Sequence, residues 1–373
     1  MQPIYLDNAA STRPTDDVIA LMTEVMRTAW GNASAQHPQG AAARNHIAAA
    51  RERMLAALGD HRTGDIVWTS GCTEADALAV LGAARRKPGK IVISAIEHPA
   101  VAAAVARLER EVVQVAPDAT GVLDPDAVAE AARDAAVVAI VMVQNEIGSV
   151  QPIAAIAEAV RRVAPACHIH VDAAQAFGKI AFEVGGLGID SLAIAGHKLH
   201  GPKGAGALWL REGIDLEPLW IGGGQQRGLR GGTQDTPGIA GLGLAAERAV
   251  AALPAARARW LELAARATGK LAGARQLVPD HRRSPHILAL GFPGVPASAL
   301  RSVLASRGVY VSTGSACAER DSKPSAVLAA INLPKDVGMC RLSFGLDTTA
   351  AEVDTAAATI ADVVRELSSG RPS

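Results

Sequence analysis

Residues 168–175 read HIHVDAAQ, a short apolar run that ends in an acidic and then an amide side chain. A run of this length without polar alternation is typical of a strand that is buried on both faces of a sheet. Similar β-branched runs occur at 65–69, 90–95, 112–115, 136–143, 191–195 and 205–210. We therefore predict that residues 168–171 and these runs form a sheet of buried parallel strands.

Segments with helical spacing lie between the predicted strands, at 74–86, 99–111, 126–133 and 152–163. Alternation of strands and helices indicates an α/β fold with a mostly parallel sheet. After about residue 255 the pattern changes to a long Ala/Arg-rich helical stretch, strands at 286–291 and 339–344, a helix at 297–307 and a terminal helix. We expect a large α/β domain over 15–255 and a small α+β domain from 1–14 and 256–373, with the N-terminal segment packing across it.

The composition excludes several classes of protein. The chain has 373 residues with 37 basic and 37 acidic side chains, and this zero net charge argues against a polybasic nucleic-acid surface. With 49% hydrophobic and 20% charged residues, disorder is not expected. The longest apolar run has about nine residues, well short of the ~18 that a spanning helix needs. Without a signal sequence at the N-terminus, we expect a cytoplasmic protein with no membrane contact.

Four cysteines stand at 72, 167, 317 and 340, too far apart for a CxxC pair. A zinc or iron–sulfur site within one segment is therefore not expected. His168 and His170 alternate along one strand, but a single carboxylate, Asp172, follows them. We predict no metal site, and we expect Cys72, Cys167 and Cys340 to pack in the interior.

Polar residues close the predicted strands, where ligands of open α/β sheets bind. Residues 69–74, TSGCTE, lead from a strand into a helix, and free N–H groups there suit a phosphate, although Thr73 as an ordinary helix cap is an open alternative. Lys198 lies in 195–204, AGHKLHGPKG, where burial would lower its pKa. An amine for a Schiff base, a carboxylate at Asp172 for a pyridinium nitrogen, and a phosphate cradle are together the requirements of pyridoxal 5'-phosphate.

These motifs belong to a longer, collinear set. The set is YLDNAA at 5–10, GNAS at 31–34, TSGCTEADAL at 69–78, EH at 97–98, NEIG at 145–148, VDAAQ at 171–175, GHK at 196–198, GGGQQRGLRGGT at 222–233, GSAC at 314–317 and RLS at 341–343. With it the chain resembles cysteine desulfurases of the NifS/IscS-like group, in the class V aminotransferase family. The resemblance implies the pyridoxal-phosphate-dependent transferase fold type I, with a mostly parallel central sheet in the large domain.

The resemblance also implies roles for residues of the cofactor site. Lys198 would bind the cofactor as a Schiff base and later move protons, and Asp172 would keep the pyridine nitrogen protonated. His98 would lie over the ring and act as an acid or base. Gln175 would hydrogen-bond the phenolic oxygen, with Asn145 beside it.

Phosphate and substrate ligands follow from the same resemblance. Thr73 and His197 would bind the phosphate, and Thr233 would reach in from the second subunit of a homodimer. Arg341, assisted by Asn32, would hold the carboxylate of L-cysteine.

Cys317 ends the small-residue stretch 310–317, YVSTGSAC, and a polar segment with Arg320 and Lys323 follows it. Such surroundings suit a reactive thiolate. The resemblance implies that Cys317 takes sulfur from L-cysteine as a persulfide, releases L-alanine and passes the sulfur to an acceptor protein. Iron–sulfur assembly, tRNA thiolation, cofactor synthesis and sulfur modification of DNA all remain open as destinations.

Two departures from the family pattern leave alternatives open. Ala195 stands where members commonly have a hydroxyl that binds the phosphate, and the loop after Cys317 is slightly shorter than in housekeeping members. A related lyase or aminotransferase would use the same cofactor without a persulfide, and a catalytically weak scaffold of a sulfur-transfer complex would tolerate the missing hydroxyl.

Overall fold

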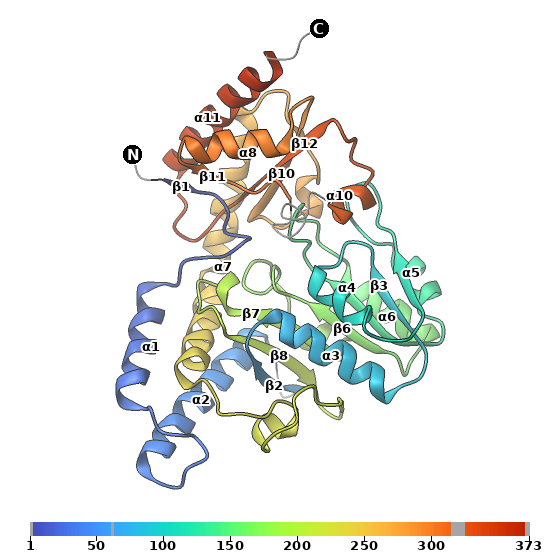
Figure 1. Ribbon diagram of the computed structural model, residues 1–373, viewed down its shortest axis with the longest axis vertical. Coiled ribbons are helices and arrows are strands. Elements are labelled where there is room, and N and C mark those ends of the chain that lie inside the picture. Colours follow the sequence, from blue (N-terminus) through green and yellow to red (C-terminus); the bar gives the residue numbers. More distant parts are fainter. Residues whose placement is uncertain (1–2, 61–62, 315–324, 370–373) are drawn as a thin grey trace.

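The computed structural model describes residues 3–60, 63–314 and 325–369. Within these residues the main sheet has seven strands in the order β2-β8-β7-β6-β5-β3-β4. The strands are β2 (Gly64–Thr69), β3 (Lys90–Ser94), β4 (Val112–Val115), β5 (Ala135–Val141), β6 (His168–Asp172), β7 (Ser191–Ala195) and β8 (Gly206–Arg211). Each coincides with a predicted run to within two residues, which confirms the α/β class (Figure 1).

The sheet is mixed, so the prediction of a parallel strand at 205–210 is wrong. β8 pairs antiparallel with both β7 and β2, whereas β7, β6, β5, β3 and β4 pair in parallel. Only residues 196–205 connect β7 to β8, with no room for the crossover helix that a parallel connection needs. The short connection therefore returns the chain beside β7 in the opposite direction.

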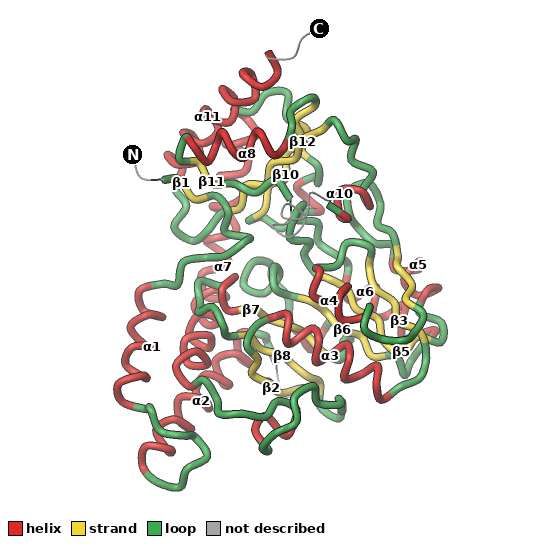
Figure 2. Tube along the Cα trace, in the orientation of Figure 1, coloured by secondary structure: helices red, strands yellow, loops and turns green. Residues whose placement is uncertain are grey.

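Helices cover both faces of the sheet (Figures 1 and 2). The predicted helices appear as α3 (Cys72–Arg86), α4 (Pro99–Val105), α5 (Pro125–Ala131) and α6 (Ile153–Val163), and α1 (Asp16–Thr28) and α2 (Pro38–Ala57) were not predicted. The helix expected over 99–111 ends early, because the N–H groups of Arg107 and Leu108 form tight turns to Ala104 and Val105. Neighbouring residues of β2 split between faces: Trp68 belongs to the core on the face that carries α2, α5 and α6, and Val67 belongs to the core beside α3.

A second, smaller layer lies above the sheet in Figure 1. β9 (Arg275–Gln276), β10 (Ile287–Pro293) and β12 (Val337–Ser343) form an antiparallel sheet. β1 (Ile4–Tyr5) pairs with β11 (Val309–Tyr310), so the N-terminal segment does pack across this layer, as expected. Within the described part of the chain, the layer contains the helices α8 (Ala297–Ser306), α10 (Ala326–Ala330) and α11 (Ala350–Ser369).

The long helix α7 (Thr236–Lys270) links the two layers. Its residues up to Val250 pack in the core of the main sheet, and those from Leu253 pack in the second core. The predicted domain boundary at 255/256 falls inside this helix, and the domain limits stay a prediction. By length and composition alone α7 is also apolar enough to cross a membrane, but here it packs against α1, α2 and α11 as a core helix.

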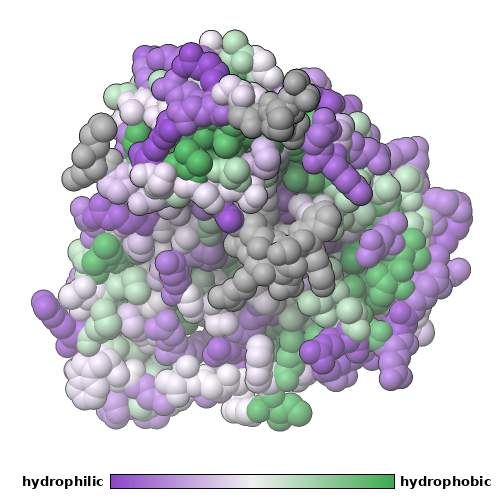
Figure 3. Space-filling view, turned by 45° about the horizontal axis from the view of Figure 1, so that its top comes forward, coloured by the Kyte–Doolittle hydropathy of each residue, from purple (hydrophilic) through white to green (hydrophobic). Residues whose placement is uncertain are grey.

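Most of the surface drawn in Figure 3 is polar, with hydrophobic residues in separate patches. The most exposed large apolar side chains among the described residues are Ile221 (95%) and Trp30 (70%). Both side chains lie outside the two cores and are exposed to solvent in the single chain.

Candidate active site

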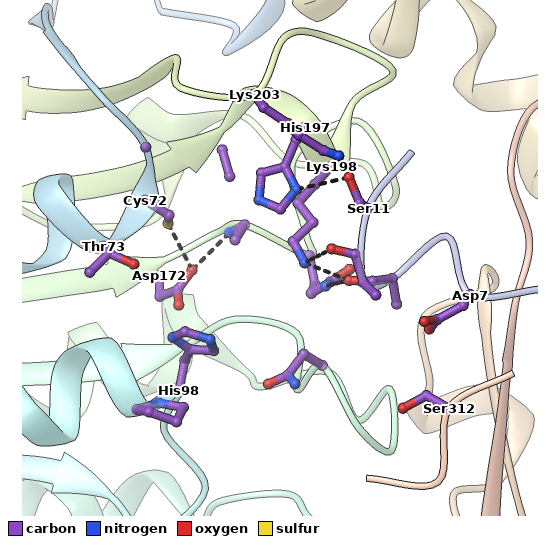
Figure 4. Close-up of a pocket in the computed structure, with 18 of the residues that line it drawn as sticks. Asp7, Ser11, Cys72, Thr73, His98, Asp172, His197, Lys198, Lys203 and Ser312 are labelled. Carbon is purple, nitrogen blue, oxygen red and sulfur yellow. Dashed lines mark hydrogen bonds between the residues drawn. The ribbon is translucent and has the colours of Figure 1, made fainter. Parts of the chain in front are cut away.

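A cavity of about 730 Å³ opens where the ends of β6 and β7 face the second layer. It is lined by eight of the predicted site residues: Thr73, His98, Asn145, Asp172, Gln175, His197, Lys198 and Arg341. Figure 4 shows the side chains converging on this space from several elements. The polar side chains that the sequence places at strand ends thus meet around one cavity.

Lys198 lies in the 3₁₀ turn Gly196–Lys198 that directly follows β7. Its Nζ atom donates hydrogen bonds to the carbonyl oxygens of Ala9 (2.6 Å) and Ala10 (2.9 Å). Burial, followed by the charge of Arg341, lowers the pKa of Lys198 to about 8, against the opposing effect of Asp172. About a tenth of its amine is therefore neutral and nucleophilic at pH 7, far more than for an ordinary lysine.

Asp172 ends β6 and is 4% exposed. Its Oδ1 atom accepts hydrogen bonds from the backbone N–H of Ala174 (2.8 Å) and from Sγ of Cys72 (3.3 Å). Among the described residues no Lys or Arg forms an ion pair with it, and an unpaired buried carboxylate is costly. A protonated pyridine nitrogen would supply the missing cation, so this carboxylate fits pyridoxal phosphate.

Cys72 is one of the cavity residues that the sequence analysis missed, as are Asp7 and Lys203. We expected it to pack in the interior, but it lines the cavity, while Cys167 and Cys340 are buried. Burial and the nearby carboxyl groups of Asp172 and Asp76 raise its pKa well above the ordinary value. Its thiol is therefore a hydrogen-bond donor rather than a nucleophile, and its position in the TSGC segment was the available signal.

Cys72, Asp76 and Asp172 place three possible metal-ligating atoms within 4.8 Å of one another. The two histidines of the 168–175 segment lie further inside: His168 Nε2 and His170 Nδ1 are each 2.8 Å from the Ser191 hydroxyl. His170 Nε2 is 3.1 Å from Asp76, whose pKa burial raises well above its usual range. The absence of a metal stays a prediction.

The N-terminus of α3 forms one wall of the cavity. Gly71 precedes it without any side-chain cap, so the first N–H groups of the helix face the cavity without that partner. A Cβ atom on Gly206 would lie 2.5 Å from Gly71, so glycine at the start of β8 permits this close approach. Free N–H groups at a helix N-terminus bind phosphate well, which fits the predicted cradle.

His197 and Thr73 line the same wall, and so does Ala195, which brings no hydroxyl. Nδ1 of His197 lies 3.3 Å from the hydroxyl of Ser11. Burial, assisted by the charge of Lys198, lowers the pKa of His197 to about 4, so the ring is neutral at neutral pH. A neutral ring would contact a phosphate through an N–H group rather than through charge.

His98 caps the start of α4, where its Nδ1 atom accepts a hydrogen bond from Ala100 N–H (3.1 Å). Burial lowers its pKa below the ordinary value, against the opposing effect of Asp172. Across the cavity, Gln175 donates from Nε2 to Ala9 (2.7 Å), and Asn145 accepts from Gln144 (3.2 Å).

Arg341 in β12 is 3% exposed and lies on the wall that belongs to the second layer. One terminal nitrogen donates to the carbonyl oxygen of Asn145 and the other to Asp7, each at 2.5 Å. Its Nε atom is buried without a hydrogen-bond partner in the described residues. The guanidinium is thus held in place through both of its terminal nitrogens.

Three predicted site residues are not brought to the cavity by the described chain. Thr233 and Asn32 are exposed and do not line it, and the Asn32 side chain accepts a hydrogen bond from Ser34 N–H (2.9 Å). Cys317 lies outside the described residues, although Gly314, three positions before it, lines the cavity. The roles of these three residues stay predictions.

Comparisons with known proteins agree with this chemistry. Residues 4–355 match the model of the aminotransferase class-V family. A cysteine desulfurase of Cereibacter sphaeroides is 37% identical over 98% of this chain and 97% of its own length. Among solved structures, a NifS-like protein superposes with a TM-score of 0.92 at 32% identity, covering 98% of this chain and 100% of that one. A structure described as SspA in complex with cysteine has a TM-score of 0.81 at 33% identity, covering 91% of this chain and 98% of its own. The chain belongs to the aminotransferase class-V family, in its NifS/IscS-like group of pyridoxal-phosphate-dependent cysteine desulfurases.

Proposed function

We propose that the cavity converts L-cysteine to L-alanine and that Cys317 takes up the sulfur as a persulfide for transfer to an acceptor protein. The observation that carries this proposal is the convergence of Lys198, Asp172 and the uncapped N-terminus of α3 on one cavity. When bound there, pyridoxal phosphate would act as an electron sink that weakens bonds to the α-carbon of the substrate.

Lys198 would hold the cofactor and then move protons at the substrate. Its lowered pKa, about 8, supports both roles, because the amine can lose and regain a proton near neutral pH. Asp172 would pair with the pyridine nitrogen, Gln175 and Asn145 would contact the phenolic oxygen, and His98 would cover the ring.

Arg341 would bind the carboxylate of L-cysteine. Its fixed position on the cavity wall and its planar guanidinium group support this role. Asn32 is proposed to assist, and the described chain does not bring it there, so its contribution would depend on a second subunit or on movement of its loop.

The Cys317 thiolate would attack the substrate sulfur. The new S–S bond would form as the carbon–sulfur bond breaks, and a proton would replace sulfur on the carbon, giving alanine. Gly314 on one side lines the cavity, and Ser325 on the other donates a hydrogen bond to buried Glu146 (2.7 Å). Both ends of the segment that carries Cys317 are thus held close to the substrate-binding wall.

We further propose a cytoplasmic homodimer in which Thr233 completes the phosphate site of the neighbouring subunit. Exposed Thr233 and the apolar side chains Trp220 and Ile221 on the same segment of chain support a subunit interface there. Iron–sulfur assembly is one of the destinations proposed for the sulfur.

One experiment tests the reaction and its residues. The purified protein, supplied with pyridoxal phosphate, L-cysteine and a thiol reductant, should release equal amounts of alanine and sulfide. Cys317→Ala should stop both products and leave the yellow colour of the bound cofactor intact. Alanine formation that survives this change would favour a related lyase, and a colourless wild-type protein would favour the weak scaffold.

A further inference from the structure

The two layers of the molecule are joined by a buried hydrogen bond beside the cavity. Nε2 of His286, just before β10, lies 3.2 Å from Oε1 of Gln175, which follows β6. His286 is 1% exposed and Gln175 is 4% exposed. Only Gln175 of the two lines the cavity, so this bond connects the second layer to the site.

The contacts of Gln175 fix the orientation of its amide group. Its Nε2 atom lies 2.7 Å from the carbonyl oxygen of Ala9, and a carbonyl can only accept. The amide NH₂ therefore faces Ala9, and the amide oxygen faces His286. Because that oxygen is also only an acceptor, Nε2 of His286 must carry a hydrogen.

The surroundings keep His286 in this single tautomer. Burial lowers the pKa of His286 well below its ordinary value, and the positive charges of Lys179, Arg341, Lys198 and Arg283 act in the same direction. The ring therefore has one proton, on Nε2, and Nδ1 accepts a hydrogen bond from the Ser284 hydroxyl (2.7 Å). Trp260 packs against the ring with centroids 5.8 Å apart.

We propose that His286 is a positioning residue that locks the Gln175 amide, so that its second N–H points into the cavity toward the ring oxygen of the bound cofactor. One N–H of this amide is used by Ala9, and no described residue accepts the other. This inference rests on the proposed function, in which Gln175 contacts that oxygen.

Two substitutions separate the hydrogen bond from the packing. His286→Phe keeps a ring against Trp260 and removes the donor, whereas His286→Gln keeps an N–H near the Nε2 position and removes the ring. The readouts are the dissociation constant of pyridoxal phosphate from the purified apoprotein and the midpoint of the pH-dependent change in its visible band.

We expect His286→Phe to weaken cofactor binding about tenfold. It should also move the midpoint upward by about one pH unit, because an N–H donor favours the ionised oxygen that it faces. His286→Gln should stay within about threefold of the wild type, since the donor is retained. The reverse order, with His286→Gln more affected than His286→Phe, would show a packing role and overturn the proposal.

A double substitution tests whether His286 acts through Gln175. In a Gln175→Leu background, adding His286→Phe should change the dissociation constant by less than about twofold, and fully additive losses would overturn the proposal. If His286→Phe fails to fold, Ser284→Ala provides a milder change, because it removes only the donor to Nδ1. It should change the dissociation constant and the midpoint in the same directions by smaller amounts, and wild-type values of both would count against the proposal. A wild type that binds no cofactor would defeat the proposed function and this inference with it, whereas cofactor binding that His286→Phe leaves unchanged would defeat this inference alone.

Discussion

The two walls of the cavity are built in different ways. The cofactor wall carries Lys198 and Asp172 at the ends of buried parallel strands, together with the N-terminus of α3. The substrate wall carries Arg341 from β12. This strand belongs to the second layer, which packs around a separate hydrophobic core. On the cofactor wall, burial beside the strands sets the protonation of the reactive group, as the lowered pKa of Lys198 shows. On the substrate wall, the position of Arg341 depends on its contacts with Asp7 and Asn145 across the cavity.

The largest effect should come from the cofactor wall. Lys198→Ala removes the amine that would hold the cofactor, and alanine production should fall by at least ~10³-fold, a loss typical of a missing nucleophile or base. Alanine release measures the role of Lys198 in moving protons, and the visible spectrum measures its role in holding the cofactor. Lys203, which also lines the cavity, provides the control: Lys203→Ala should keep the colour, and loss of colour in that variant alone would reassign the amine.

A smaller effect should follow on the substrate wall. Arg341→Lys keeps the charge but loses the planar two-donor fork, so the KM for L-cysteine should rise about a hundredfold. The spectrum of the bound cofactor should stay as in the wild type, because lysine retains the positive charge of Arg341 and Lys198 keeps its own hydrogen-bond partners. Unchanged KM in steady-state assays would remove Arg341 from substrate binding.

A stability effect should appear at Glu97, beneath the cofactor wall. Burial raises the pKa of Glu97 to about 8, and its Oε2 atom has no hydrogen-bond partner in the described residues. A carboxyl group whose pKa is higher in the folded than in the unfolded protein contributes its stability in full at a pH below the unfolded pKa. This contribution is lost as the pH rises through the folded pKa. Stability should therefore fall between about pH 4.5 and pH 8.

Glu97→Gln removes this titration. Urea unfolding at pH 5 and pH 9 should show a decrease in the free energy of unfolding of the wild type that exceeds the decrease in the variant by on the order of 4 kcal/mol. Glu111, an exposed acidic residue, serves as a control whose change to Gln should leave the pH dependence unaltered. Parallel curves for the wild type and Glu97→Gln would contradict the raised pKa.

The smallest effect should come from Cys72. Its thiol is a weak donor to Asp172, so Cys72→Ala should change the dissociation constant of pyridoxal phosphate by about threefold. Cys72→Ser retains a donor and should lie closer to the wild type in the same titration. Loss of sulfide production in Cys72→Ser would instead assign the thiol a direct chemical role.

The elements that the sequence predicted well are those whose pattern is local. Buried strands appear as apolar runs, so β6 and β7 and the residues at their ends could be read directly. The helix α1 was missed, and the direction of β8 was wrong, because direction depends on the length of the connection that follows β7 rather than on the strand's own residues. The motif resemblance supplied Arg341, which no periodicity would have connected to the strand ends.

By itself, the sequence determined the fold class, the residues at the strand ends and the family, since apolar runs and motif spacing are properties of neighbouring residues. Only the tertiary structure decided which groups touch. Asp7 and Arg341 are 334 positions apart, and Gln175 and His286 are 111 apart. Likewise the thiol of Cys72 meets Asp172 across 100 positions. Such contacts follow from how two separate cores pack around one cavity, and burial there, rather than residue type, sets the proton on His286 and the pKa of Lys198.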